Sequence, residues 1–225
     1  HCIKNNIVGT FFSTPQGVNT TLSGKKKALI ELVSLLEKKF KLTIKDETWS
    51  SSNSLPFKRL KIKCRNRLLP LKGDFDPVTS RGKHLNYQDW NKLITDPNTI
   101  ILDVRNNYET EIGTFKNSII PKMDNLTEFP HFVDKELSEI KKKKIAMFCT
   151  GGIRCEIASS FMMNEGFEDV YQLDGGILRY LKDVQDENLW EGECFVFDER
   201  VTVDKNLEPG NFLQCFGCRR PLSKT

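Results

Sequence analysis

Residues 149–155, Cys-Thr-Gly-Gly-Ile-Arg-Cys, bring together the side chains of this sequence that are best suited to chemistry. They follow an apolar run at 145–148, typical of a buried strand, and precede apolar residues at helical spacing. Backbone N–H groups at the start of such a helix, with Gly151 and Gly152 free to turn them inward, form an anion site. A Cys149 thiolate held there beside the charge of Arg154 has a lowered pKa and is nucleophilic. The predicted active-site loop after Cys149 consists of Thr150, Gly151, Gly152, Ile153 and Arg154.

The number of residues between Cys149 and Arg154 indicates which group the loop suits. Protein tyrosine phosphatases use a Cys-x5-Arg loop that holds a tetrahedral phosphate, whereas Cys149 and Arg154 enclose only four residues. The tighter loop suits the outer sulfur of a persulfide, or another small group, better than it suits phosphate. A buried structural cysteine before a helix is the alternative, because cysteines are often buried. The two glycines, the arginine and the strand-end position together favour an active site.

Cys155 follows Arg154 directly and has two interpretations. As a resolving thiol it would react with an oxidised or persulfidated Cys149. As a small residue in the first turn of a helix it would only fill space. The sequence leaves both interpretations open.

The surrounding elements predict how the loop is positioned. Strand-like runs at 100–102, 145–148 and 170–173 alternate with helical segments. This alternation predicts a parallel sheet flanked by helices, whose working site lies beyond the carboxyl ends of the strands. Asp103 and Arg105 follow the first strand as Cys149 follows the second, so we expect them to support the site.

The rest of the chain divides at changes in composition. Residues 1–72 contain strand candidates at 7–12, 18–22 and 57–67 and one amphipathic helix, which suits an α+β ferredoxin-like domain lacking its first strand. Residues 73–96, which contain Pro and Gly, are expected to be a linker. Residues 97–184 are expected to form the parallel α/β domain and 185–225 a cysteine-containing extension. We expect both the first domain and this extension to be truncated.

Several motifs in residues 97–184 resemble those of rhodanese. They are Cys149–Arg154, Leu102–Arg105 with Tyr108, Glu109 and Gly113 behind it, and Leu173–Ile177. Where the rhodanese pattern has His after the glycine, this chain has Thr114. The resemblance implies a rhodanese domain and, as one activity, a sulfurtransferase reaction in which Cys149 carries a persulfide.

A wider resemblance spans nearly the whole chain. Gln16–Asn19, Leu22–Gly24, Pro56–Lys61 and Trp190–Arg200 are similar to segments of the bacterial tRNA uridine hydroxylases, which join a ferredoxin-like domain, a rhodanese domain and a cysteine-containing segment. This resemblance implies 5-hydroxylation of the wobble uridine of tRNA, with molecular oxygen as co-substrate and Cys149 as the active-site thiol or persulfide. The sequence contains no Gly-x-Gly-x-x-Gly for a flavin or nicotinamide, and no cofactor is identifiable from it.

Five cations alternate with apolar residues in the third strand candidate. They are Arg59, Lys61, Lys63, Arg65 and Arg67. A period of two puts them on one face of a strand and Leu60, Ile62 and Cys64 on the other. A solvated outer face is the alternative, but five cations without an interleaved acid favour tRNA phosphates as the partner.

Composition sets the remaining expectations. With 38% hydrophobic and 28% charged residues, and no apolar run near 18 residues, we expect no membrane span. Seven irregularly spaced cysteines favour the reducing cytoplasm over a secreted disulfide framework. Cys215 and Cys218 form half of a zinc site, so we expect no bound metal unless further ligands complete it. The oligomeric state stays open.

Overall fold

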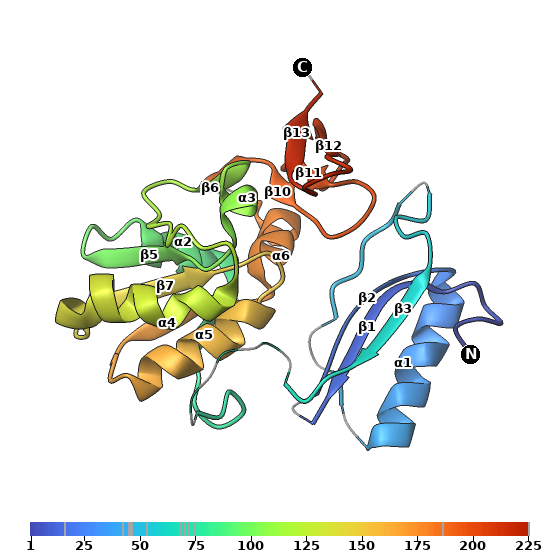
Figure 1. The fold of residues 1–225 in the computed structure, drawn as a ribbon, viewed down its shortest axis with the longest axis horizontal. Helices are drawn as coiled ribbons and strands as arrows, with labels where there is room; N and C mark the ends of the chain where they lie inside the picture. Colours follow the sequence, from blue (N-terminus) through green and yellow to red (C-terminus); the bar gives the residue numbers. More distant parts are fainter. Residues whose placement is uncertain are drawn as a thin grey trace. The chain divides into compact units, whose positions relative to one another are not determined.

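The computed structural model describes residues 1–15, 17–41, 43–44, 47–52, 54–67, 69, 71, 73, 75–185 and 187–224. The chain forms two compact units (Figure 1). The first comprises residues 1–68 with the short segment Phe197–Glu199, and the second comprises Leu69–Val196 with Arg200–Thr225.

The first unit is a small sheet with one helix. Strands β1 (Val8–Thr14) and β2 (Gly17–Ser23) form an antiparallel hairpin, and β3 (Leu60–Cys64) pairs in parallel with β1, which gives the order β2-β1-β3. Helix α1 (Lys26–Phe40) buries Ala28 and Leu32 against Ile7. These elements confirm the α+β class predicted for this part of the chain.

The second unit is built on a four-stranded parallel sheet in the order β4-β8-β7-β5. The strands are β4 (Lys83–Leu85), β5 (Thr99–Asp103), β7 (Lys144–Phe148) and β8 (Val170–Leu173). Every strand contributes hydrophobic residues to a core, as expected for a sheet covered on both faces.

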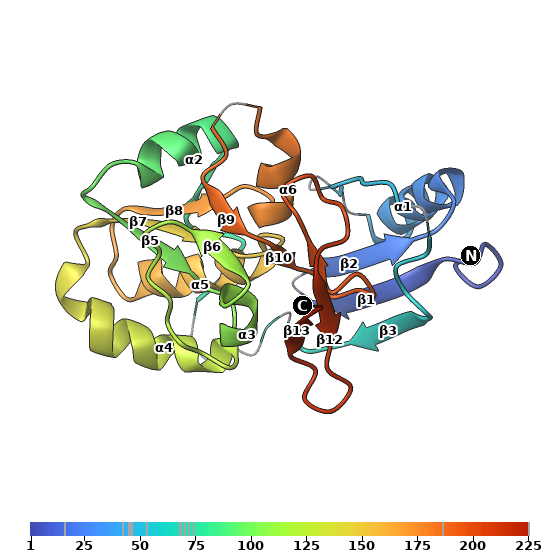
Figure 2. The same ribbon diagram turned by 90° about the horizontal axis from the view of Figure 1, so that it is seen from above.

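Helices cover the two faces of this sheet (Figure 2). Helices α2 (Tyr87–Ile94) and α6 (Gly176–Asp183) pack on one face, against Ala146 and Phe148. Helix α5 (Ile153–Asn164) packs on the other, against Ile145 and Met147. Beside α5 runs a helical stretch made of a 3₁₀ turn (Leu126–Glu128), α4 (Phe129–Phe132), a π turn (Val133–Leu137) and a second 3₁₀ turn (Ser138–Ile140). The predicted doubly covered parallel sheet is confirmed.

Short elements complete the second unit. Helix α3 (Asn107–Thr110) and strand β6 (Gly113–Phe115) follow β5, and β6 pairs antiparallel with β9 (Trp190–Gly192). Strands β10 (Cys194–Phe195) and β11 (Thr202–Val203) form one antiparallel pair, and β12 (Phe212–Gln214) and β13 (Pro221–Ser223) another.

The structure corrects three predicted boundaries. The expected linker at 73–96 contains β4 and α2: the Asn86 side chain caps α2, and Trp90 is fully buried. The Pro and Gly before residue 83 hid this helix from sequence reasoning. Leu71, expected in the first domain, packs in the core of the second unit. The extension at 185–225 begins inside that unit, because Trp190 and Cys194 belong to its core.

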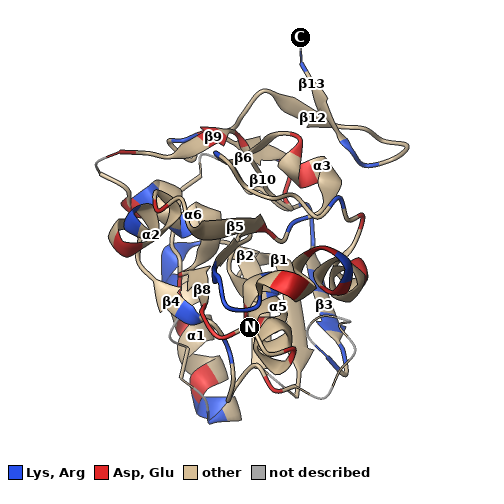
Figure 3. Cartoon of the chain, turned by 90° about the vertical axis from the view of Figure 1, so that its left-hand side faces the viewer, with Lys and Arg blue, Asp and Glu red and all other residues tan. Residues whose placement is uncertain are grey.

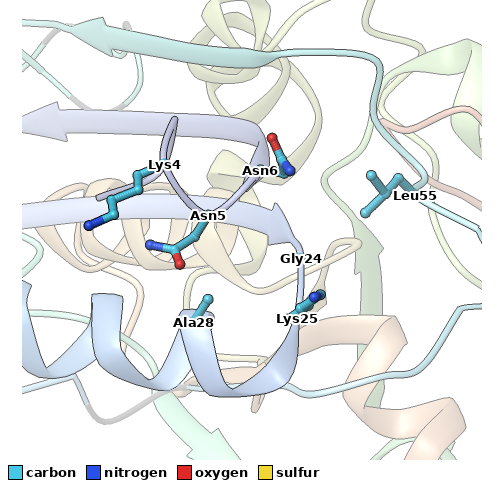
Figure 4. Close-up of a pocket in the computed structure, with 7 residues that line it drawn as sticks. All are labelled: Lys4, Asn5, Asn6, Gly24, Lys25, Ala28 and Leu55. Atoms are coloured by element: carbon cyan, nitrogen blue, oxygen red, sulfur yellow. The ribbon is translucent and has the colours of Figure 1, made fainter.

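Away from Cys149, the described residues offer a pocket but no membrane-spanning helix. Among the described helices, none combines the length and the apolar character needed to cross a bilayer. The first unit has a pocket of about 280 Å³, drawn in Figure 4. Its lining is Lys4, Asn5, Asn6, Gly24, Lys25, Ala28 and Leu55, which includes no thiol, hydroxyl or carboxylate side chain.

Candidate active site

Cys149 lies immediately beyond the carboxyl end of β7, and its sulfur faces the start of α5. Gly152 precedes α5 with φ of +89°, a conformation that glycine adopts without strain, and its N–H donates to Cys149 Sγ over 3.1 Å. The backbone N–H groups of Arg154 and Cys155 donate to the same sulfur. Three amides therefore converge on it. Gly151, by contrast, has no positive φ and is exposed.

This environment ionises the thiol. Burial of Cys149 opposes ionisation, but the hydrogen bond from the Cys155 thiol, the positive charge of Arg154 and the two amides outweigh it and lower the pKa of Cys149 to about 6. Burial, together with the hydrogen bond to Cys149, raises the pKa of Cys155 well above its usual value. At neutral pH the pair is thus a Cys149 thiolate hydrogen-bonded by a neutral Cys155 thiol.

Arg154 is fixed by a carboxylate to which sequence reasoning gave no role of its own. Its guanidinium donates two hydrogen bonds to Glu109, at 2.5 and 2.8 Å, and a third to Thr150 Oγ1 at 3.2 Å. Glu109 is fully buried on α3, and although burial opposes its ionisation, the Arg154 charge lowers its pKa. The signal was present in the sequence, because Glu109 belongs to the motif after Arg105, but spacing alone could not pair it with Arg154.

Asp103 and Arg105 form a second buried ion pair beside the site. Arg105 Nε and Nη2 donate to the two carboxylate oxygens of Asp103 at 2.8 and 2.6 Å, and Nη2 also donates to the Gly113 carbonyl. The guanidinium lies 5.1 Å from the ring centroid of Trp190. Thr114, at the departure from the rhodanese pattern, donates to Asp103. The pair thus links the end of β5 to β6 and β9.

The opposite side of the loop is held by the start of α6. The N–H groups of Ile177 and Leu178 donate to the carbonyls of Cys149 and Thr150, at 3.0 and 3.1 Å. Gly176 has φ of +67°, and a Cβ there would lie 2.5 Å from the Cys149 carbonyl oxygen. Only glycine fits this contact, and sequence reasoning noted the two glycines at 175–176 without this reason.

The five predicted tRNA-binding cations do not all lie within one strand. Only Lys61 and Lys63 lie within β3, while Arg59, Arg65 and Arg67 flank it. On the face that carries the apolar residues, Ile62 is 63% exposed and Cys64 is exposed, while Leu60 is half-buried. The core beneath α1 contains no β3 residue, so most of this face is open to solvent. Figure 3 shows the Lys and Arg of β3 in blue.

Cys215 and Cys218 lie in the turn between β12 and β13. The N–H groups of Cys218 and Gly217 donate to the Cys215 sulfur and lower its pKa. Within the described residues, no three side chains of His, Cys, Asp or Glu gather in a way that could hold a metal ion. Two thiols alone do not make a structural zinc site.

Comparison with known protein families separates the same two parts of the chain. Residues 86–183 match the model of the rhodanese-like domain. The second unit therefore contains a rhodanese domain. Residues 1–68 match the UPF0176 acylphosphatase-like domain, so a ferredoxin-like domain precedes the rhodanese domain. The chain is thus rhodanese-related.

Solved structures similar to this chain cover about half of it. A rhodanese-related protein from Thermoplasma volcanium is 24% identical, with 48% of this chain and 98% of that chain covered and a TM-score of 0.38. The rhodanese-like domain of an Anabaena protein is 20% identical, with 48% of this chain and 78% of that chain covered and a TM-score of 0.40.

Proposed function

We propose that this protein modifies tRNA, hydroxylating C5 of the wobble uridine with molecular oxygen as co-substrate and with Cys149 as the active-site thiol or persulfide. The combination of a UPF0176 acylphosphatase-like domain with a rhodanese domain carries the proposal. A sulfurtransferase alone needs only the second of these domains. The cations of β3 give the first unit a surface that suits a polyanion.

The proposed role of Cys149 follows from its surroundings. A thiol with a pKa of about 6 is mostly thiolate at neutral pH and therefore nucleophilic. The three amides that stabilise the thiolate are equally suited to the negative outer sulfur of a persulfide. This cradle favours sulfurtransfer through a Cys149 persulfide as the second candidate function.

Nucleoside analysis of bulk tRNA tests the first candidate. A strain that lacks this gene, and any redundant pathway, should lose 5-hydroxyuridine and its derivatives. The wild-type gene should restore them, Cys149→Ser should not, and Cys2→Ser serves as a matched thiol control away from the loop. Unchanged 5-hydroxyuridine in the deletion strain would exclude the hydroxylase.

Intact-mass analysis tests the second candidate. Protein treated with thiosulfate should gain about 32 Da, one sulfur atom, and Cys149→Ser should gain nothing. Transfer of that sulfur to cyanide without any change in tRNA nucleosides in the deletion strain would favour the sulfurtransferase over the hydroxylase.

A further inference from the structure

We propose that Cys155 is the thiol that resolves a persulfide on Cys149, releasing sulfide and leaving a Cys149–Cys155 disulfide. This inference rests on the persulfide chemistry proposed for Cys149, and it assigns a reaction to Cys155 in addition to its effect on the pKa of Cys149.

The two thiols lie at the same helix start, near enough to interact electrostatically. Cys155 is the third residue of α5, and its thiol donates a hydrogen bond to the Cys149 sulfur. Its backbone N–H points to the same atom and also donates to the Gly152 carbonyl over 2.9 Å. The thiol is therefore aimed at Cys149 by the first turn of a helix.

Burial protects this interaction from competition. Both cysteine side chains are 0% exposed, and both belong to one hydrophobic cluster with Ala158 and Met162 from α5. A bulky external thiol must first open the loop to reach Cys149, whereas Cys155 is already beside it. An internal thiol close to the reacting sulfur has the advantage of high effective concentration.

The proposed step balances without a further reagent. The Cys155 sulfur attacks Cys149 Sγ, the bond between Cys149 Sγ and the outer sulfur breaks, and hydrosulfide leaves with the proton of the Cys155 thiol. The outer sulfur is reduced to sulfide, and the two cysteines are oxidised to a disulfide. A cellular low-molecular-weight thiol can then reduce that disulfide by ordinary exchange.

The interaction between Cys149 and Cys155 also determines when Cys155 can attack. While Cys149 is a thiolate, its negative charge and its hydrogen bond hold the proton on Cys155. Once Cys149 carries a second sulfur, the negative charge moves to the outer atom and Cys149 Sγ becomes the electrophile. Cys155 is thus kept as a neutral thiol until a persulfide exists.

Trypsin provides a direct readout, because it cleaves between Arg154 and Cys155. Fully reduced protein is treated with thiosulfate without oxygen, and sulfide is measured before alkylation and digestion. Wild type should release close to one equivalent of sulfide, and peptide 145–154 should be linked to peptide 155–179. A disulfide between Cys215 and Cys218 would instead stay within peptide 206–219, so the two are told apart.

Cys155→Ala and Cys155→Ser provide the contrast, since both small residues preserve the packing. Each should keep the persulfide, seen as about 32 Da on peptide 145–154, and release at least about ten-fold less sulfide. A stable persulfide in wild type with no linked peptides would overturn the resolving role but leave the chemistry of Cys149 intact. No sulfur uptake in wild type or in either variant would overturn both the resolving step and the sulfurtransferase, whereas tRNA hydroxylation is judged separately by nucleoside analysis.

Discussion

The loop at 149–155 and strand β3 are the two chemically suggestive regions of this chain, and they are built in opposite ways. Around Cys149, Arg154 pairs with the buried Glu109, the Gly152 N–H donates to Cys149 Sγ, and the Cys149 carbonyl accepts from the Ile177 N–H. On β3, Lys61 and Lys63 are exposed, and the apolar Ile62 between them is exposed as well. The chemistry of the loop depends on where each group is placed, whereas the binding proposed for β3 depends on charge alone.

This difference decides how each region should respond to change. A buried polar network fails when one member is removed, because the remaining member keeps its charge without a partner. A row of exposed cations loses binding gradually, since each contributes a screened interaction with a phosphate. Single substitutions should therefore cost much more around Cys149 than on β3.

Glu109→Gln should have the largest effect. It leaves Arg154 buried beside a neutral amide, and breaking such a pair costs about 3–5 kcal/mol of unfolding free energy. Denaturant unfolding measures the loss. Glu139→Gln, on the surface turn at Ser138–Ile140, is the matched control and should change stability little.

The double variant Glu109→Gln with Arg154→Met sharpens this result. Removing both charges should recover part of the lost stability, as it does for other buried pairs. It should still raise the pKa of Cys149 above about 6, because the Arg154 charge that lowers it is gone. A double variant no more stable than the single one would show that Glu109 does more than neutralise Arg154.

The ionisation of Cys149 predicts a pH dependence with a definite sign. Its folded-state pKa of about 6 lies below that of a free thiol, so thiolate formation stabilises the fold increasingly from about pH 6 to pH 9. That contribution is lost as the pH falls through about 6. The melting temperature of wild type relative to Cys149→Ser should rise across this range, and thiolate absorbance should show a midpoint near pH 6 that Cys149→Ser lacks.

Substitutions at two glycines distinguish a backbone position that requires glycine from one that is only close to the loop. Gly176→Ala forces a Cβ against the Cys149 carbonyl at positive φ and should cost about 1–3 kcal/mol. Gly151→Ala meets nothing within 4 Å and has no positive φ, so it should cost under about 0.5 kcal/mol. Equal losses in urea unfolding would contradict the placement of α6 against the loop.

Sequence reasoning reached the rhodanese domain because its signals are local. An apolar run before Cys149 and helical spacing after it define a strand–loop–helix without knowledge of distant contacts. Glu109 and Gly176 act through contacts 45 and 27 residues away from Arg154 and Cys149, which spacing along the chain cannot show. On β3 the period of two correctly predicted a strand. Burial of either face of that strand depends on what α1 covers, and the core beneath α1 contains no β3 residue.

The smallest single effects should come from β3. Replacing Lys61 and Lys63 with Ala should weaken tRNA binding and reduce the slope of log K against log salt by about 1 for each phosphate that is no longer neutralised. Both side chains are exposed, so stability should hardly change and the loss of affinity should be similar for all tRNAs. Lys142→Ala with Lys143→Ala removes the same charge from an exposed turn of the other unit and should leave the slope unchanged. If both pairs lower the slope equally in a filter-binding titration, tRNA senses only the net charge of the protein and β3 has no special role.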